Sequence, residues 1–218
     1  MMIIEKFLLR ETARREIYKG LSDCYYIPDS SLTHRLKKME RHLALLDSRA
    51  LPYIILMRSE LQIVEDLDAL RSEFARLFVG PYSLPAPPYG SVYLENEWRI
   101  MGESTVDASN RYRDSGLNLS ESFKDPPDHI AAELEFMYFL VFSEIDTIRT
   151  DHADAGCEYL YRQKLFLTDH LGAWIEEFSR HAEQDTKSDF YRNLVTATRV
   201  YIAEDLEYLS SLKVCQAM

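Results

Sequence analysis

Apolar residues recur at spacings of three and four along most of this chain, and this periodicity constrains the fold more than any other feature. One example consists of Leu67, Leu70, Phe74, Leu77 and Phe78. Because an α-helix has 3.6 residues per turn, residues at these spacings share one helix face. Only seven glycines interrupt the 218 residues. The sequence therefore predicts an all-α protein in which residues 1–218 form a single domain.

Turn and capping residues divide this pattern into helices. We expect a first helix that ends before Pro28, a second that begins at Ser30 or Ser31 and is interrupted by Pro52, one that ends at Phe78, a short one between Ser104 and Gly116, and two late helices that begin near Asp169 and at Ser188. Gly80 and Pro81 terminate the third of these, because neither residue continues a helix readily.

The stretch Arg71–Tyr93 changes character after that helix. It contains four of the eight prolines, at positions 81, 85, 87 and 88. Proline fixes φ and lacks an N–H donor, so the stretch is predicted to be an ordered, extended loop that carries Tyr82, Tyr89 and Tyr93. Such a loop is either a rigid connector over the core or a binding surface. Residues 93–102 either pair as a small hairpin or continue the loop.

A second motif, Asp125-Pro126-Pro127-Asp128-His129, directly precedes an apolar periodic segment that starts at Ile130. Proline suits the first turn of a helix, and an aspartate can accept hydrogen bonds from the free N–H groups there. Either Asp125 or Asp128 is therefore expected to cap the helix that follows. Initiation of this helix is the motif's structural role, whatever else it does.

The charge and the cysteines limit the possible partners. A formal net charge of -11 and a pI near 5.0 disfavour nucleic acid and anionic membranes, and favour a basic peptide among charged partners. Three scattered cysteines suggest neither a disulfide framework nor a zinc site. The sequence shows neither a signal-peptide pattern nor an apolar run of about 18 residues, so we expect a cytoplasmic protein without membrane insertion.

Catalytic motifs are scarce. His129 and Glu133 lie four residues apart and could share a metal on one helix face, which is the one specific hypothesis for an enzyme. The Glu-x-x-His pair of di-iron bundles, the His-Glu-x-x-His of zinc proteases, the phosphate loop and the dinucleotide-binding glycine motif are all missing from the sequence. The residues do not specify a reaction.

Several short motifs, in this order, resemble the TorD/DmsD/NarJ family of redox-enzyme maturation chaperones. They are Phe74-x-x-Leu77-Phe78-x-Gly80-Pro81, Pro88-Tyr89-x-Ser91-Val92-Tyr93, Gly102-Glu103-Ser104, Pro126-x-Asp128-His129, and a C-terminal group that includes His170-Leu171-x-x-Trp174 and Ser188-x-Phe190-Tyr191. The matches extend over roughly residues 67–209. Each motif is weak alone, whereas their combination in order is fairly specific.

This resemblance implies a helical bundle of the TorD type that binds the twin-arginine signal peptide of a molybdenum-cofactor oxidoreductase in the cytoplasm until the cofactor is inserted. It implies neither catalysis nor a cofactor, and the protein would be a monomer or a homodimer. The family's peptide-binding residues correspond to Phe74, Leu77, Phe78, Tyr82, Gly102, Pro126, Asp128 and His129. Phe74 and Tyr82 stand where some members have tryptophan.

Two alternatives remain from this reasoning. In the first, the protein is a NarJ-like assembly factor that binds a subunit without a twin-arginine signal. In the second, it is a small metal-dependent enzyme that uses His129 and Glu133.

Overall fold

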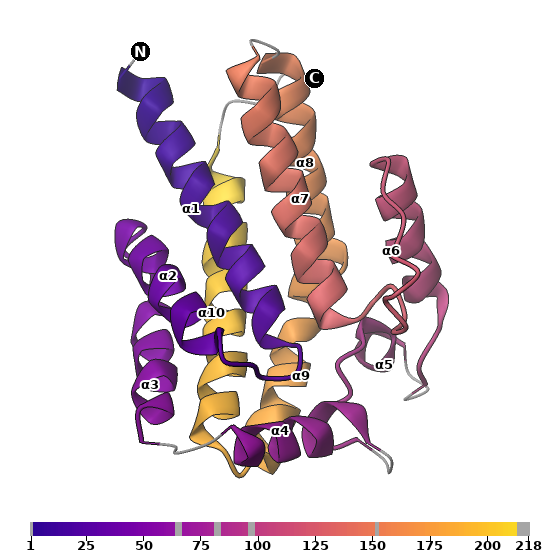
Figure 1. The fold of residues 1–218 in the computed structure, drawn as a ribbon. Coiled ribbons are helices and arrows are strands. Elements are labelled where there is room, and N and C mark those ends of the chain that lie inside the picture. The colour runs from indigo at the N-terminus through magenta and orange to yellow at the C-terminus, as the bar shows by residue number, and fades with distance from the viewer. Residues whose placement is uncertain (1, 64–66, 81–83, 96–98, 151–152, 213–218) are drawn as a thin grey trace.

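The computed structural model describes residues 2–63, 67–80, 84–95, 99–150 and 153–212, and the regular elements in these ranges are helices (Figure 1). They are α1 (Met2–Cys24), α2 (Leu32–Leu45), α3 (Leu51–Leu61), α4 (Asp68–Phe74), the π-helical turn η1 (Ala75–Val79), α5 (Gly90–Leu94), α6 (Glu103–Asp114), α7 (Ile130–Arg149), α8 (Ala153–Asp169), α9 (Leu171–Asp185) and α10 (Asp189–Ser211). One isolated antiparallel bridge joins Tyr89 to His129. The predicted all-α fold is confirmed.

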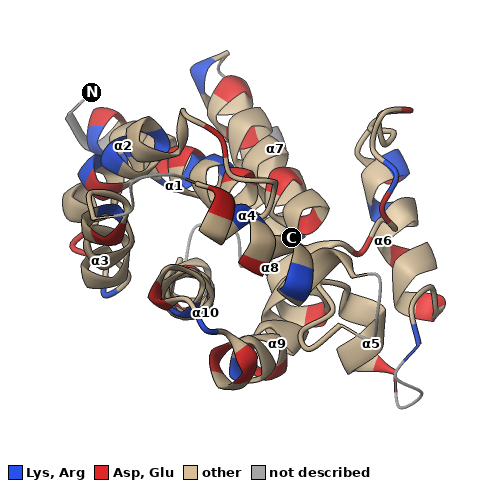
Figure 2. Cartoon of the chain, turned by 60° about the horizontal axis from the view of Figure 1, so that its bottom comes forward, with Lys and Arg blue, Asp and Glu red and all other residues tan. Residues whose placement is uncertain are grey.

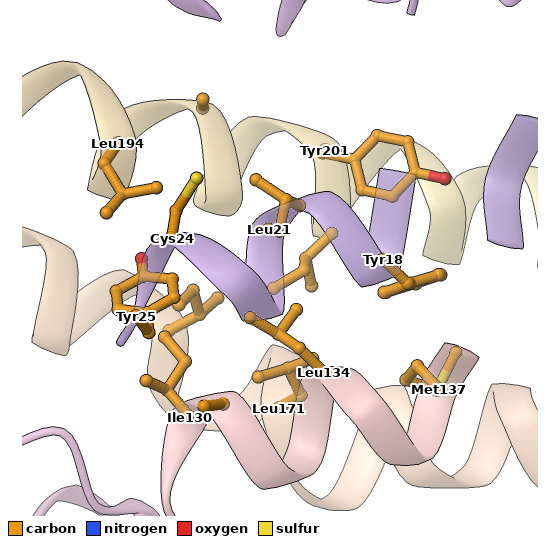
Figure 3. Close-up of a cluster of buried hydrophobic side chains, with 14 of the residues drawn as sticks. Tyr18, Leu21, Cys24, Tyr25, Ile130, Leu134, Met137, Leu171, Leu194 and Tyr201 are labelled. Carbon is orange, nitrogen blue, oxygen red and sulfur yellow. The ribbon is translucent and has the colours of Figure 1, made fainter. Parts of the chain in front are cut away.

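Helix α1 lies in the middle of the bundle, between α7 and α10 (Figure 3). Its inward side chains include Tyr18, Leu21 and Tyr25, each at most 2% exposed. Leu134 of α7 and Leu194 of α10 face this helix from either side and are fully buried. Burial of each large apolar side chain contributes about 1.5 to 3 kcal/mol to the stability of the fold. Helix α1 therefore stabilises the core on both its α7 side and its α10 side.

A buried ionic cluster accompanies this apolar core. The Arg14 guanidinium donates to both carboxylate oxygens of Asp205, at 2.6 and 2.8 Å, and it also contacts Glu11. Glu144 lies 3.8 Å from the same guanidinium and accepts a 2.7 Å bond from Gln163. The carboxylates around it raise the pKa of Arg14 well above its usual value despite the opposing effect of burial. This cluster joins α1, α7, α8 and α10 around a single guanidinium, and burial together with the nearby Glu11 raises the pKa of Glu144 to about 8.

Most predicted helix boundaries are confirmed. The first helix ends before Pro28, Ser31 and Ser188 occupy N-cap positions, and both Gly80 and Gly116 follow a helix with positive φ, at 97° and 79°. Glycine tolerates such φ values because it lacks a Cβ atom. The positions of the helices thus follow largely from local sequence signals.

Other local predictions were wrong. Pro52 lies in the first turn of α3, where its missing N–H costs nothing, so it starts a helix instead of interrupting one. Ser104 does not cap α6, because Gly102 is the N-cap residue. Over residues 84–89, the part of the predicted loop before α5 that the structure describes, the chain is not helical, but Tyr93 lies in the short helix α5.

The apolar periodicity did not identify helix α8, although Phe166 of this helix belongs to the region that resembles the family's closing helices. Its buried residues Leu160, Gln163 and Leu167 are three and four positions apart, which is the helical spacing that could have revealed it. Asp169, expected near the start of the next helix, is instead the last residue of α8. For residues 93–102 we expected either a small hairpin or a continued loop. Leu94 is helical in the structure, which fits neither alternative at this position, and residues 96–98 lie outside the described ranges.

Helix α6 stands beside α5, to one side of the antiparallel α7–α8 pair (Figure 1). Tyr112 of α6 reaches across to Phe136 and Phe166, with ring centroids 4.6 and 6.2 Å away. Lys and Arg are interspersed with Asp and Glu over the helix surfaces in Figure 2. Among the described helices, none is both long enough and apolar enough to cross a membrane.

Candidate functional site

The proline-rich loop and the Asp-His motif meet where α5 and α7 begin. The Gly90 N–H donates to the Asp128 carbonyl and the Ile130 N–H donates to the Pro88 carbonyl, both at 2.9 Å. The Ser91 N–H donates to Asp128 Oδ2 at 2.7 Å. Two segments that are about forty residues apart in the sequence therefore form one hydrogen-bonded junction.

Asp128 does not cap α7, and neither does Asp125, so that prediction was wrong. The N-cap residue is His129, whose Nδ1 accepts the Ala131 N–H at 3.1 Å. The Asp125 side chain accepts a 2.9 Å bond from the Tyr89 hydroxyl instead. The His129 N–H donates a 3.0 Å bond to the Pro126 carbonyl and closes a turn before α7. The N-cap position therefore falls on His129, one residue after Asp128.

Asp128 is fully buried at this junction. Its Oδ2 holds the first turn of α5, whereas its Oδ1 is buried without a hydrogen-bond partner among the residues that the structure describes. A buried carboxylate needs such bonds to offset the loss of hydration. Asp128 is thus a link between α5 and the start of α7, not an exposed acid in this conformation.

His129 is 7% exposed and lies between two aromatic rings. The ring centroids of Tyr89 and Phe123 are 5.4 and 6.0 Å away, and both approach edge to face. Burial lowers the pKa of His129 to about 4, even though Asp125 and Asp128 oppose this shift. The imidazole is therefore neutral near pH 7, as its role as a hydrogen-bond acceptor requires.

A chain of polar side chains, formed by Trp174, Glu133, His170 and Asp107, adjoins the junction, and we call it the polar relay. The fully buried Glu133 accepts a 2.9 Å bond from Trp174 Nε1, and its other oxygen lies 3.4 Å from His170 Nδ1. His170 Nε2 lies 2.7 Å from the half-exposed Asp107 of α6. Burial raises the pKa of Glu133. Burial alone would lower the pKa of His170, but the carboxylates of Glu133 and Asp107 outweigh this effect, so the pKa of His170 is raised. The relay connects α6, α7 and α9.

The expected residues Phe74, Leu77 and Phe78 lie in a separate aromatic cluster, and each is at most 6% exposed. Phe78 lies at its centre, with ring centroids between 5.5 and 6.1 Å from those of four neighbours. These neighbours are Phe74, Tyr25, Phe178 and Tyr191. Leu77 and Phe78 therefore face inward, as the helical periodicity predicted, and they stabilise the frame beneath the proline-rich loop.

Gly102 links α5 to α6. The Glu95 carboxylate accepts bonds from both the N–H and the hydroxyl of Ser104, at 3.0 and 2.6 Å, and so caps the start of α6. A Cβ atom added at Gly102 would overlap this carboxylate. The position therefore requires glycine for space. Tyr82, the remaining expected site residue, lies outside the described residues.

The geometry does not favour the metal hypothesis for His129 and Glu133. His129 Nδ1 is used in capping α7, and Glu133 is committed to Trp174 and His170. Within the described ranges, His, Cys, Asp and Glu side chains do not gather in threes that could hold a metal ion. Sequence reasoning recognised Glu133 only as a metal ligand and missed its pairing with His170 and Asp107, which lie on other helices.

An apolar groove of about 550 Å3 opens beside the junction. One wall is α7 and the other is the segment that follows α6, with Tyr26 at one edge. The aromatic residues that line it are Tyr26, Tyr112, Phe123, Phe136, Tyr138 and Phe139. Glu135 is the single charged residue among the described residues of its lining. Phe123 contacts both the groove and His129, so the junction supports one end of this groove.

Comparison with known proteins gives consistent matches. The chain is 24% identical over 211 residues to the chaperone protein TorD of Psychrobacter sp., and the aligned region covers 92% of this chain and 93% of TorD. It is 39% identical over 137 residues to the Tat proofreading chaperone DmsD of Salmonella typhi, and this aligned region covers 63% of this chain and 60% of DmsD.

A crystal structure described as a redox enzyme maturation protein from Archaeoglobus fulgidus has the same fold, with a TM-score of 0.56 and 24% sequence identity over 87% of this chain and 93% of that one. The family profile described as nitrate reductase delta subunit matches residues 36–180, about two thirds of the chain. These relatives are chaperones, not enzymes. The chain therefore belongs to the nitrate reductase delta subunit family, as a redox-enzyme maturation chaperone of the TorD/DmsD type.

Proposed function

We propose that the protein binds the twin-arginine signal peptide of a molybdenum-cofactor oxidoreductase in the cytoplasm and holds it until the cofactor has been inserted. The DmsD relative is described as a Tat proofreading chaperone, which supports a signal peptide as the ligand. The observation that carries the proposal is the aromatic groove beside the Asp128–His129 junction. A leader combines arginines with an apolar segment, and such a segment needs an apolar groove of this kind.

The residues expected to bind the peptide would then have two different roles. Pro126, Asp128 and His129 form the junction that supports the groove, and Asp128 would act through α5 because its side chain is buried. Phe74, Leu77 and Phe78 would support the loop from inside. Gly102 would keep α6 close to α5, and Tyr82 stays a proposed contact. These assignments are proposals that substitution can test.

The decisive test is a titration of the purified full-length chain with leader peptides from the molybdoenzymes of the same genome. Each peptide is compared with a variant in which its arginine pair is replaced by lysines. The proposal predicts saturable binding of at least one leader and weaker binding of its lysine variant. Leaders that all fail to bind would overturn the proposed function.

A NarJ-like role is the second candidate, and the family description favours it because it refers to the nitrate reductase delta subunit. In that role the protein would bind the N-terminal segment of a subunit that lacks an arginine pair. The same titration separates the two candidates, because such a segment would bind more tightly than any twin-arginine leader.

A further inference from the structure

Three carboxylates are near enough to Tyr26, at one edge of the apolar groove, to influence the pKa of its hydroxyl. Burial raises the pKa of the Tyr26 hydroxyl, and these nearby carboxylates raise it further. They belong to Asp23 at the end of α1, Asp125 before α7 and Glu135 on α7. Asp23 and Glu135 both contact the ammonium group of Lys19, and we call these two residues the acidic rim.

Lys19 is the cation that occupies this rim. Its ammonium group donates to Asp23 Oδ1 at 2.8 Å and to Glu135 Oε1 at 3.2 Å. The side chains are accessible, with 38% of Lys19, 25% of Asp23 and 49% of Glu135 exposed. Arg35 approaches Asp23 only to 3.9 Å, because its 2.7 Å partner is Asp29. One ammonium therefore serves two carboxylates, and the rim retains negative charge.

We propose that the acidic rim binds the arginine pair of the leader while the adjoining groove takes its apolar segment. This inference rests on the proposed function and names the residues that would give it specificity. The complementarity is spatial as well as electrostatic, because Glu135 belongs both to the groove lining and to the rim, and Tyr26 of the lining lies beside the rim. Basic and apolar parts that are adjacent in the peptide would meet acidic and apolar surfaces that are adjacent in the protein.

Arginine suits this rim better than lysine does. A guanidinium is planar and offers five N–H donors, so it can bridge two carboxylates in fixed directions, whereas an ammonium acts as a compact point charge. Lys19 already supplies one such point charge. A leader arginine would replace it at Asp23 and Glu135, and the loss of an exposed lysine pair costs little. Lys19 is thus an internal competitor for the arginine site.

The experiment measures the affinity of full-length variants for the leader that binds most tightly and for its lysine variant. Glu135→Gln and Asp23→Asn each retain side-chain shape but remove a charge, and each should weaken the arginine peptide about tenfold, with a smaller effect on the lysine peptide. Lys19→Gln should have the opposite effect and strengthen the arginine peptide about threefold, because the competitor is gone. A variant that merely loses stability would not bind more tightly.

Glu177→Gln is the matched control. Glu177 lies on α9, is 53% exposed and pairs with Arg180 at 3.1 Å, so it resembles Glu135 in exposure and pairing but lies outside the groove. Its substitution should leave both affinities unchanged. Arginine-peptide affinities that stay at the wild-type value in Glu135→Gln and Asp23→Asn would overturn the rim assignment and leave the proposed function standing. Failure of every leader to bind the wild type would instead overturn both.

Discussion

Two buried clusters of carboxylates stabilise this bundle in different ways. Around Arg14, the acids pair with a guanidinium that is itself fully buried. At the junction of the proline-rich loop with α7, Asp128 and Glu133 are held mainly by neutral donors, the Ser91 N–H and Trp174 Nε1. The first cluster joins long helices around one buried guanidinium that faces three carboxylates. The second links α5 and α9 to α7 beside the groove with few bonds, so single substitutions there should shift the groove without unfolding the protein.

The largest expected effect is at the first cluster. Arg14→Met would leave Glu11, Glu144 and Asp205 buried together without a counter-charge, and we expect a loss of about 3 to 5 kcal/mol in the free energy of unfolding. Urea denaturation at pH 7 measures this loss. Arg180→Met removes an exposed pair with Glu177 and serves as the control, with an expected change of about 0 to 1 kcal/mol. Similar losses in both variants would contradict the contrast between the clusters.

The junction should make the free energy of unfolding depend on pH. The folded-state pKa of His129 is about 4, below the ordinary value of about 6.5, so the unfolded chain takes up a proton first as pH falls. Stability from this residue is therefore full above about pH 6.5 and falls by about 2 to 3 kcal/mol as pH approaches 4. His170 has a raised pKa and contributes with the opposite sign, since its contribution disappears as pH rises through its folded-state pKa.

His129→Asn isolates the first contribution. Asparagine retains the ability to cap α7 but does not titrate, so the decrease in stability between pH 6.5 and pH 4 should become shallower than in the wild type. Urea denaturation at several pH values measures the slope. His34→Asn, at an exposed position of α2, provides the control. An unchanged slope in His129→Asn would rule out a buried neutral imidazole at this position.

Asp128→Asn should have the smallest effect on stability. The new side-chain oxygen can still accept the Ser91 N–H, but the new amide N–H group is buried without an acceptor, at a cost of about 1 to 2 kcal/mol. Because the side chain is buried, we expect the arginine leader and its lysine variant to lose affinity by the same factor. A selective loss for the arginine leader would place Asp128 in direct contact with the peptide, as the resemblance to the family implied.

The sequence predicted the helices far better than the contacts between them. Helix faces such as Leu32, Leu36, Met39 and Leu43 follow from spacing along the chain, and all four are buried. The pairing of Ser91 with Asp128 joins residues 37 positions apart, and that of Asp107 with His170 joins residues 63 positions apart. Spacing carries no information on such partners. The capping prediction failed because the turn between Pro126 and His129 makes His129 the N-cap residue, while the Asp128 carboxylate accepts the Ser91 N–H.

The candidate site was recognised in part. The resemblance assigned Tyr82 of the proline-rich loop and the Pro126–His129 motif to one peptide site, and in the structure Tyr89 and Ser91 contact this motif. The residues that form the groove and its acidic rim were not predicted. Asp23 and Glu135 each lie in an ordinary helical pattern of mixed charge, and only the packing of α1 against α7 brings them to the same lysine.

The most direct test of the account is to locate the apolar segment of a bound leader. A leader peptide with benzophenone at a position in that segment is irradiated in complex with the full-length chain, and the attached residues are identified by mass spectrometry. We predict attachment within the groove, at Leu119, Phe136 or Phe139. Attachment to the Phe74–Phe78 cluster instead, with the groove unlabelled, would contradict the central claim.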